Sequence, residues 1–122
     1  MKKVGLVGGI GPESTISYYH DIVYGVQKRV GRDFFPDMSI ESIDLFKWVE
    51  LCDQKRYDEL VDFTLAPIQR LAASGADFAV LTANTAHLIF DQVQARSPIP
   101  LISIVEATAQ EAARRGYKKV GL

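Results

Sequence analysis

The segment Val4-Gly5-Leu6-Val7-Gly8-Gly9-Ile10-Gly11-Pro12 decides the fold of this chain. Its first four residues form a short apolar run that is typical of a buried strand. The glycines that follow allow a tight turn, and Pro12 suits the first position of a helix. The segment therefore predicts a strand that leads through a glycine loop into a helix.

Apolar periodicity and turn residues divide the rest of the chain into alternating helices and strands. Pro98 and Pro100 stop one helix, and Gly116 suits the position after the last one. This alternation predicts an α/β fold, flavodoxin-like or Rossmann-like, with a parallel sheet and helices on both faces. Helices are expected over residues 12–30, 46–51, 57–71, 85–95 and 105–115, and further strands over residues 38–43, 77–82, 101–104 and 118–122.

The last residues of the sequence predict the start of a second lobe. Lys118-Lys119-Val120-Gly121-Leu122 resembles Lys2-Lys3-Val4-Gly5-Leu6, which suggests that a similar half starts there. A strand over residues 118–122 would also lack the crossover helix that should cover one face of the sheet. We therefore expect residues 1–116 to form a first lobe and residues 117–122 to start a second one.

Composition excludes several classes of partner. The formal net charge of -1 gives no electrostatic footprint for nucleic acid, and the longest apolar run is far short of a membrane span. A single cysteine, Cys52, excludes an internal disulfide and any metal site built from several cysteines. We expect a cytoplasmic protein with no metal.

The glycine loop is a candidate anion site. It lacks the spacing of both nucleotide-binding fingerprints, so a nucleotide site ranks third among the functions considered. Its glycines let the main chain approach a ligand closely, and the following helix presents free N–H groups, which suits a carboxylate or phosphate bound by Gly9, Ile10 and Gly11. A tight turn with Glu13 beside the helix dipole explains the same residues equally well.

A polar run, residues 82–87, follows the third predicted strand. Asn84 and Thr85 can either cap the next helix or orient a ligand. In a flavodoxin-like strand order the first and third strands are neighbours, so this run and the glycine loop would face one crevice suited to a small amino acid. His87 can face that crevice or pack within the helix through hydrogen bonds.

Three further residues carry reactive groups. Lys47 follows the second strand and can offer a cation to a carboxylate, although a solvated helix lysine is the alternative. Cys52 is expected to fill a gap in the core. His20 is expected on a helix surface or in packing.

Several of these motifs together resemble the aspartate/glutamate racemase family. They are Gly5 to Thr15, Gly75-Ala76-Asp77-Phe78, Asn84-Thr85-Ala86-His87 and Ile99-Pro100-Leu101-Ile102-Ser103. The resemblance covers the whole chain, which is similar to the first half of such enzymes. It implies two related α/β lobes with the active site between them, and homodimers are common in the family.

The resemblance also implies a reaction: cofactor-independent racemisation of aspartate or glutamate, in which two opposed cysteines remove and return the α-proton. The first cysteine directly precedes the Asn-Thr pair, and here that position is Ala83. The second would lie beyond Leu122. A thiol with a pKa of about 8.5 can be tuned towards neutrality, whereas alanine transfers no proton and the hydroxyl of Thr82 is a poor base.

We therefore expect this chain to be inactive or nearly so, with aspartate or glutamate as its small-molecule partner. The alternative, favoured by Ala83, is a noncatalytic module that keeps the pocket for a small carboxylate or amino acid but has lost proton transfer.

Overall fold

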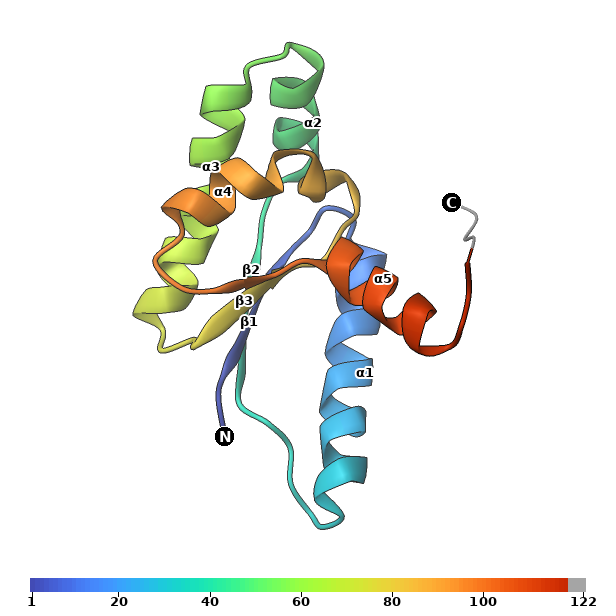
Figure 1. Cartoon of the computed structure of the whole chain (residues 1–122). Coiled ribbons are helices and arrows are strands. Elements are labelled where there is room, and N and C mark those ends of the chain that lie inside the picture. The colour runs from blue at the N-terminus through green and yellow to red at the C-terminus, as the bar shows by residue number, and fades with distance from the viewer. Residues whose placement is uncertain (119–122) are drawn as a thin grey trace.

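The structure, a computed structural model, describes residues 1–118 (Figure 1). It confirms the α/β alternation. Of residues 117–122, predicted to start a second lobe, only Tyr117 and Lys118 are described. The strand predicted over residues 118–122 therefore lies outside the described residues except for Lys118. The elements are β1 (Val4–Gly8), α1 (Pro12–Val30), β2 (Met38–Ser42), α2 (Leu45–Asp53), α3 (Tyr57–Ala73), β3 (Phe78–Leu81), the 3₁₀ helix η1 (Thr85–Ile89), α4 (Phe90–Arg96), β4 (Leu101–Ile102) and α5 (Ile104–Arg114).

The four strands form one parallel sheet in the order β2-β1-β3-β4. The first and third strands are neighbours, as the flavodoxin-like order predicts, with Val7 opposite Leu81. The chain leaves β1 towards β2 on one side and returns through β3 on the other. The carboxyl ends of β1 and β3 therefore mark the point where ligands bind in open α/β sheets.

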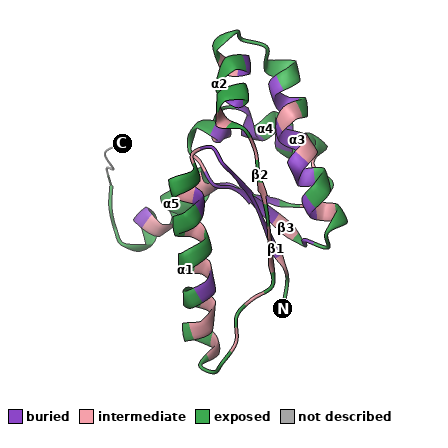
Figure 2. Ribbon diagram, turned by 180° about the vertical axis from the view of Figure 1, so that it is seen from behind, coloured by how far each residue is buried: buried purple, intermediate pink, exposed green. Residues whose placement is uncertain are grey.

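Successive residues of β1 point to opposite faces of the sheet and enter two different cores. Val7 packs with α2, α3 and α4, whereas Leu6 and Val4 pack towards α1 and the start of α5. Figures 1 and 2 show α3 and α4 on one face and α1 and α5 on the other. The expected cover of both faces is thus confirmed.

Local sequence sets most of the helix ends. Gly31 ends α1 with a left-handed φ of 75° and donates its N–H to the Gln27 carbonyl at 2.9 Å. The Asp44 carboxylate accepts the N–H of Phe46 at 2.9 Å and so begins α2. The residue types at these positions, a glycine and an aspartate, thus set the end of α1 and the start of α2.

Several bounds differ from the sequence-based prediction by one or two residues, and two of the differences change how an element is built or ends. The helix expected over residues 85–95 is a 3₁₀ helix to Ile89 and an α-helix only over Phe90–Arg96. The strand expected over residues 101–104 ends at Ile102, because the Ser103 hydroxyl accepts the N–H of Glu106 at 3.1 Å and caps α5. Within the described residues, no helix combines the length and hydropathy that a membrane span requires.

Candidate functional site

The glycine loop and the polar run meet at the carboxyl ends of β1 and β3. The Thr82 N–H donates to the Val7 carbonyl at 3.1 Å, and the Ser14 hydroxyl donates to the Thr82 carbonyl at 2.5 Å. Ser14 lies in the first turn of α1, directly after the glycine loop. The strand order and these two hydrogen bonds bring together the segments that the sequence singled out separately.

A buried chain of hydrogen bonds links the two loops through Thr15 and Thr82. The Gly9 N–H donates to Thr15 Oγ1 at 3.1 Å, and Thr82 Oγ1 donates to the Val7 carbonyl at 3.1 Å. The two hydroxyl oxygens lie 3.1 Å apart. Because Thr82 gives its one proton to Val7, the Thr15 hydroxyl can donate either to Thr82 or, at 3.5 Å, to the Gly11 carbonyl. The Thr82 side chain is 1% exposed, so a structural role accounts for its contacts.

The loop glycines serve close packing inside the protein. Gly9 has a φ of +94°, and a Cβ there would lie 2.3 Å from the Ile43 carbonyl oxygen. Ile10 is buried in the core on the α3 side. At Gly11, which precedes α1, a Cβ would meet only the Glu13 carboxylate at 3.5 Å, and no side chain caps the helix there. Gly11 is thus the open position of the three predicted loop residues.

Asn84 and Thr85 are exposed and line one cavity of about 350 Å³. The Asn84 side chain makes no capping hydrogen bond to η1, which it immediately precedes. The capping role weighed from the sequence is therefore not seen in this structure. Ala83 is half-buried and packs against the core beside them.

The other residues that line this cavity lie on η1 and α2, and none of them was predicted from the sequence as a site residue. They are Trp48, Cys52 and Leu88. Trp48 is buried, and its indole N–H donates to Thr64 Oγ1 on α3 at 3.2 Å. Trp48 and Cys52 are four residues apart and so share one face of α2, which is the signal that could have joined them.

Three other candidates occupy different surroundings. Cys52, besides lining the cavity, packs half-buried against the core as expected. Lys47 is exposed on α2 and does not line the cavity. His20 is exposed on α1, where its Nδ1 lies 3.1 Å from the Asp21 carboxylate.

His87 is half-buried, and main-chain groups engage both of its ring nitrogens. Nδ1 lies 2.9 Å from the Ala83 carbonyl oxygen, and Nε2 accepts the Ile104 N–H at 3.1 Å. These contacts favour the packing role weighed from the sequence over direct contact with a ligand.

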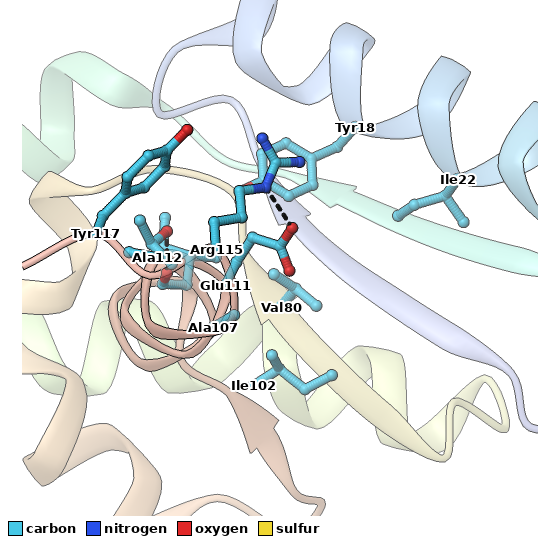
Figure 3. Close-up of a pocket in the computed structure, with 11 residues that line it drawn as sticks. Tyr18, Ile22, Val80, Ile102, Ala107, Glu111, Ala112, Arg115 and Tyr117 are labelled. Atoms are coloured by element: carbon cyan, nitrogen blue, oxygen red, sulfur yellow. Dashed lines mark hydrogen bonds and ion pairs between the residues drawn. The ribbon is translucent and has the colours of Figure 1, made fainter.

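A larger hollow of about 520 Å³ lies between α1 and α5, and it contains none of the predicted site residues. Figure 3 shows Tyr18 and Ile22 on one side and Glu111, Arg115 and Tyr117 on the other. Burial raises the pKa of the Tyr18 phenol. Of the predicted site residues, Asn84 and Thr85 line the smaller cavity instead.

Charged groups at this hollow form a small cluster on α5. Hydrogen bonds from Arg114 and Arg115 lower the pKa of Glu111 to about 2. The guanidinium nitrogens lie 2.6 and 2.8 Å from one Glu111 carboxylate oxygen. Over residues 1–118, no three or more His, Cys, Asp and Glu side chains gather as metal ligands would.

The chain is similar to racemases and racemase homologues over half of their length. It is 28% identical to the broad specificity amino-acid racemase RacX of Bacillus subtilis (strain 168), with 98% of this chain and 53% of that protein aligned. A crystal structure from Yersinia pestis matches with a TM-score of 0.89 at 29% identity, and that of an aspartate racemase homologue from Pyrococcus horikoshii OT3 with 0.82 at 32%. Each match covers 95% of this chain and 50% of the other.

A comparison at family level covers nearly the whole sequence. The profile of the family described as Asp/Glu/Hydantoin racemase matches residues 7–122, a range that includes the glycine loop and the polar run. The α/β fold with its four-stranded parallel sheet matches one half of the Yersinia pestis structure. Sequence, fold and the two joined loops lead to one conclusion: this chain belongs to the Asp/Glu/hydantoin racemase family.

Proposed function

We propose that residues 1–116 are the first lobe of a racemase fold and carry one half of a pocket for aspartate or glutamate. The observation that carries this proposal is the junction of the glycine loop with the polar run, which leaves Asn84 and Thr85 exposed on a cavity. The names of similar proteins supply the substrate class: one is a broad specificity amino-acid racemase and another an aspartate racemase homologue.

Each residue of the pocket has a proposed role. The N–H groups at the start of α1, next to Gly11, bind the α-carboxylate, because a helix N-terminus favours an anion. Asn84 and Thr85 orient the substrate by hydrogen bonds. Lys47 is exposed on α2 outside the cavity, so its proposed role is that of a nearby cation that attracts the side-chain carboxylate. Gly9 and Ile10 act by shaping the loop around the ligand.

Position 83 is where the proposed reaction would need a proton-transferring group. Racemisation needs one group that removes the α-proton from one face of the substrate and a second group that returns a proton to the other face. The methyl group of Ala83 can do neither, and Thr82 is buried and bound to Val7 and Thr15. We therefore propose that this chain binds its amino acid without efficient turnover. The proposed chemistry uses thiols and no cofactor.

Ala83 also favours a second candidate function, a noncatalytic module that binds a small carboxylate or amino acid. Both candidates predict binding by the unsubstituted chain, so binding alone does not separate them. They differ in what a thiol at position 83 would do. In a racemase-derived site the thiol would lie next to the α-carbon, whereas a site reshaped for binding would not hold the substrate in that geometry.

The test compares Ala83→Cys with its matched control Ala83→Ser. Each chain is incubated with the L and D forms of aspartate and glutamate in D₂O, and proton NMR follows the α-proton. A thiolate at position 83 takes this proton, exchanges it with solvent and returns a deuteron to the carbanion. We expect the Cys chain to exchange at least about 10²-fold faster than the Ser chain.

Calorimetric titration of the same chains separates the remaining outcomes. Binding without any gain in exchange would favour the noncatalytic module. The absence of binding by aspartate, glutamate and succinate would contradict the pocket itself. Efficient racemisation by the unsubstituted chain would contradict the proposed lack of turnover.

A further inference from the structure

His87 makes two hydrogen bonds that fix the protonation of its ring. The Ala83 carbonyl oxygen, 2.9 Å from Nδ1, can only accept a proton. The Ile104 N–H, 3.1 Å from Nε2, can only donate one. Both contacts are satisfied together only by the neutral ring that carries its proton on Nδ1.

The ring is also held in orientation. It stacks on Phe90 with 5.1 Å between ring centroids and 2° between planes. Phe90 is itself buried in the core on the α3 side of the sheet. Because the imidazole is stacked and bonded at both nitrogens, it forms a rigid link between the polar run and the start of α5.

The first of these hydrogen bonds coincides with the 3₁₀ helix that follows position 83. In an α-helix the Ala83 carbonyl would accept the N–H of residue 87. Here the imidazole takes that carbonyl, and the His87 N–H donates to the Asn84 carbonyl at 2.9 Å instead. The ring therefore contacts the main chain directly before Asn84 and Thr85, where the 3₁₀ helix begins.

The second hydrogen bond supplements the cap of α5. Ile104 is the first residue of this helix, and its N–H has no partner inside the helix. The Ser103 hydroxyl accepts from Glu106, so it does not serve Ile104. His87 meets this need and ties the β4–α5 junction to position 83.

We propose that His87 is a positioning residue, which holds the main chain at position 83 in the orientation that a proton-transferring side chain there would require. The proposal rests on the proposed function only for the role of position 83. The proposal itself concerns two hydrogen bonds and a ring tautomer. It can therefore be wrong although the substrate binds, and it can be right although no substrate binds.

The test uses the Ala83→Cys chain as a background and three substitutions of His87. His87→Asn keeps an N–H donor near the place of Nδ1, and His87→Gln puts its amide oxygen near the place of Nε2. His87→Leu removes both groups. The rate at which iodoacetamide alkylates Cys at position 83 is measured by peptide mass spectrometry, with Cys52 on α2 as the internal reference in every sample.

The expected result is a rescue by only one conservative variant. His87→Asn should keep the alkylation rate at position 83 within about twofold, while His87→Gln and His87→Leu should change it by about fivefold, the factor that one net hydrogen bond corresponds to. The rate at Cys52 should stay the same. Equal effects of the Asn and Leu variants at position 83 would overturn the proposal.

A measurement on the unsubstituted chain keeps the proposal testable if a variant fails to fold. Nitrogen-15 NMR of the histidine rings identifies which nitrogen carries the proton. We expect His87 to show a neutral ring with its proton on Nδ1, and exposed His20 provides the comparison within the same sample. A proton on Nε2 of His87, or a doubly protonated ring under the conditions of the alkylation experiment, would overturn the proposal.

Discussion

Gly9 illustrates how a single residue shapes the site without touching a ligand. Its φ of +94° lies in the region that favours glycine, and the place of a Cβ is filled by the Ile43 carbonyl. Its N–H joins the hydrogen-bonded chain through Thr15 to Thr82. Gly9 thus fixes the glycine loop against both the polar run and the connection after β2.

Gly9→Ala should therefore destabilise the fold more than a change at a glycine with similar φ but open surroundings. We expect a loss of about 3 kcal/mol in the free energy of unfolding, from backbone strain together with the clash at Ile43. Gly31→Ala is the matched control, since Gly31 has a φ of +75° and no atom of the described residues lies within 4 Å of the place that a Cβ would take. It should cost about 1 kcal/mol.

Urea denaturation of the two variants and the unsubstituted chain measures both losses. Equal losses would show that the Ile43 contact does not constrain Gly9.

The sequence predicts one property of position 83, its place in a motif, but not the residues that hold its main chain. The motif around Asn84 and Thr85 predicts that Ala83 stands at the position of a catalytic thiol, because the order of residues in the motif is local information. The groups that hold its main chain are Ser14, bonded to the preceding carbonyl, and His87, which also reaches Ile104. Such partners come from distant segments, so no local pattern predicts them.

Most helices and strands follow their predicted bounds closely, because apolar periodicity reports directly which side is buried. The helix α3, for example, was expected over residues 57–71 and spans Tyr57–Ala73. The main exception is the segment after Ala83, where the His87 side chain contacts the Ala83 carbonyl and the His87 N–H donates to Asn84. Periodicity does not report that kind of competition between side chain and main chain.

The last turn of α5 gives a prediction on pH. Arg114 and Arg115 lower the pKa of Glu111 from 4.5 to about 2, because they hydrogen-bond to its charged form. The lowered pKa means that these contacts stabilise the fold fully above about pH 4.5 and that their contribution is lost as the pH falls towards 2.

Carbon-13 NMR of the Glu111 carboxyl group measures this titration. We expect a midpoint near 2 in the unsubstituted chain, and a return towards 4.5 when Arg114 and Arg115 are both replaced by Gln. A midpoint near 4.5 in the unsubstituted chain would contradict the ion pairs. So would an unchanged midpoint in the double variant.

On the scale of the whole molecule, the order of the sheet creates the site. The order β2-β1-β3-β4 was predictable from alternating elements together with the flavodoxin-like arrangement, and it joins the glycine loop to the polar run. The wall formed by Trp48 and Cys52 was not predicted. It depends on how α2 packs on α3, where the Trp48 indole bonds to Thr64, and that contact is set by tertiary packing.

Two of the hollows in the described part of the chain compete as binding sites. One lies at the carboxyl ends of β1 and β3 and is lined by Asn84 and Thr85. The other lies between α1 and α5, is larger and mostly apolar, and includes Tyr18 and Tyr117. A small amino acid with two carboxylates should select the first, because the side chains of Asn84 and Thr85 there can donate hydrogen bonds.

Mapping the bound amino acid on the molecule tests this claim most directly. Aspartate or glutamate is titrated into the nitrogen-15-labelled, unsubstituted chain, and the amide signals are followed by two-dimensional NMR. We expect saturable shifts at residues 11, 13–15 and 83–85, with little change along α5. Shifts confined to the hollow between α1 and α5, or none at saturating amino acid, would contradict this claim.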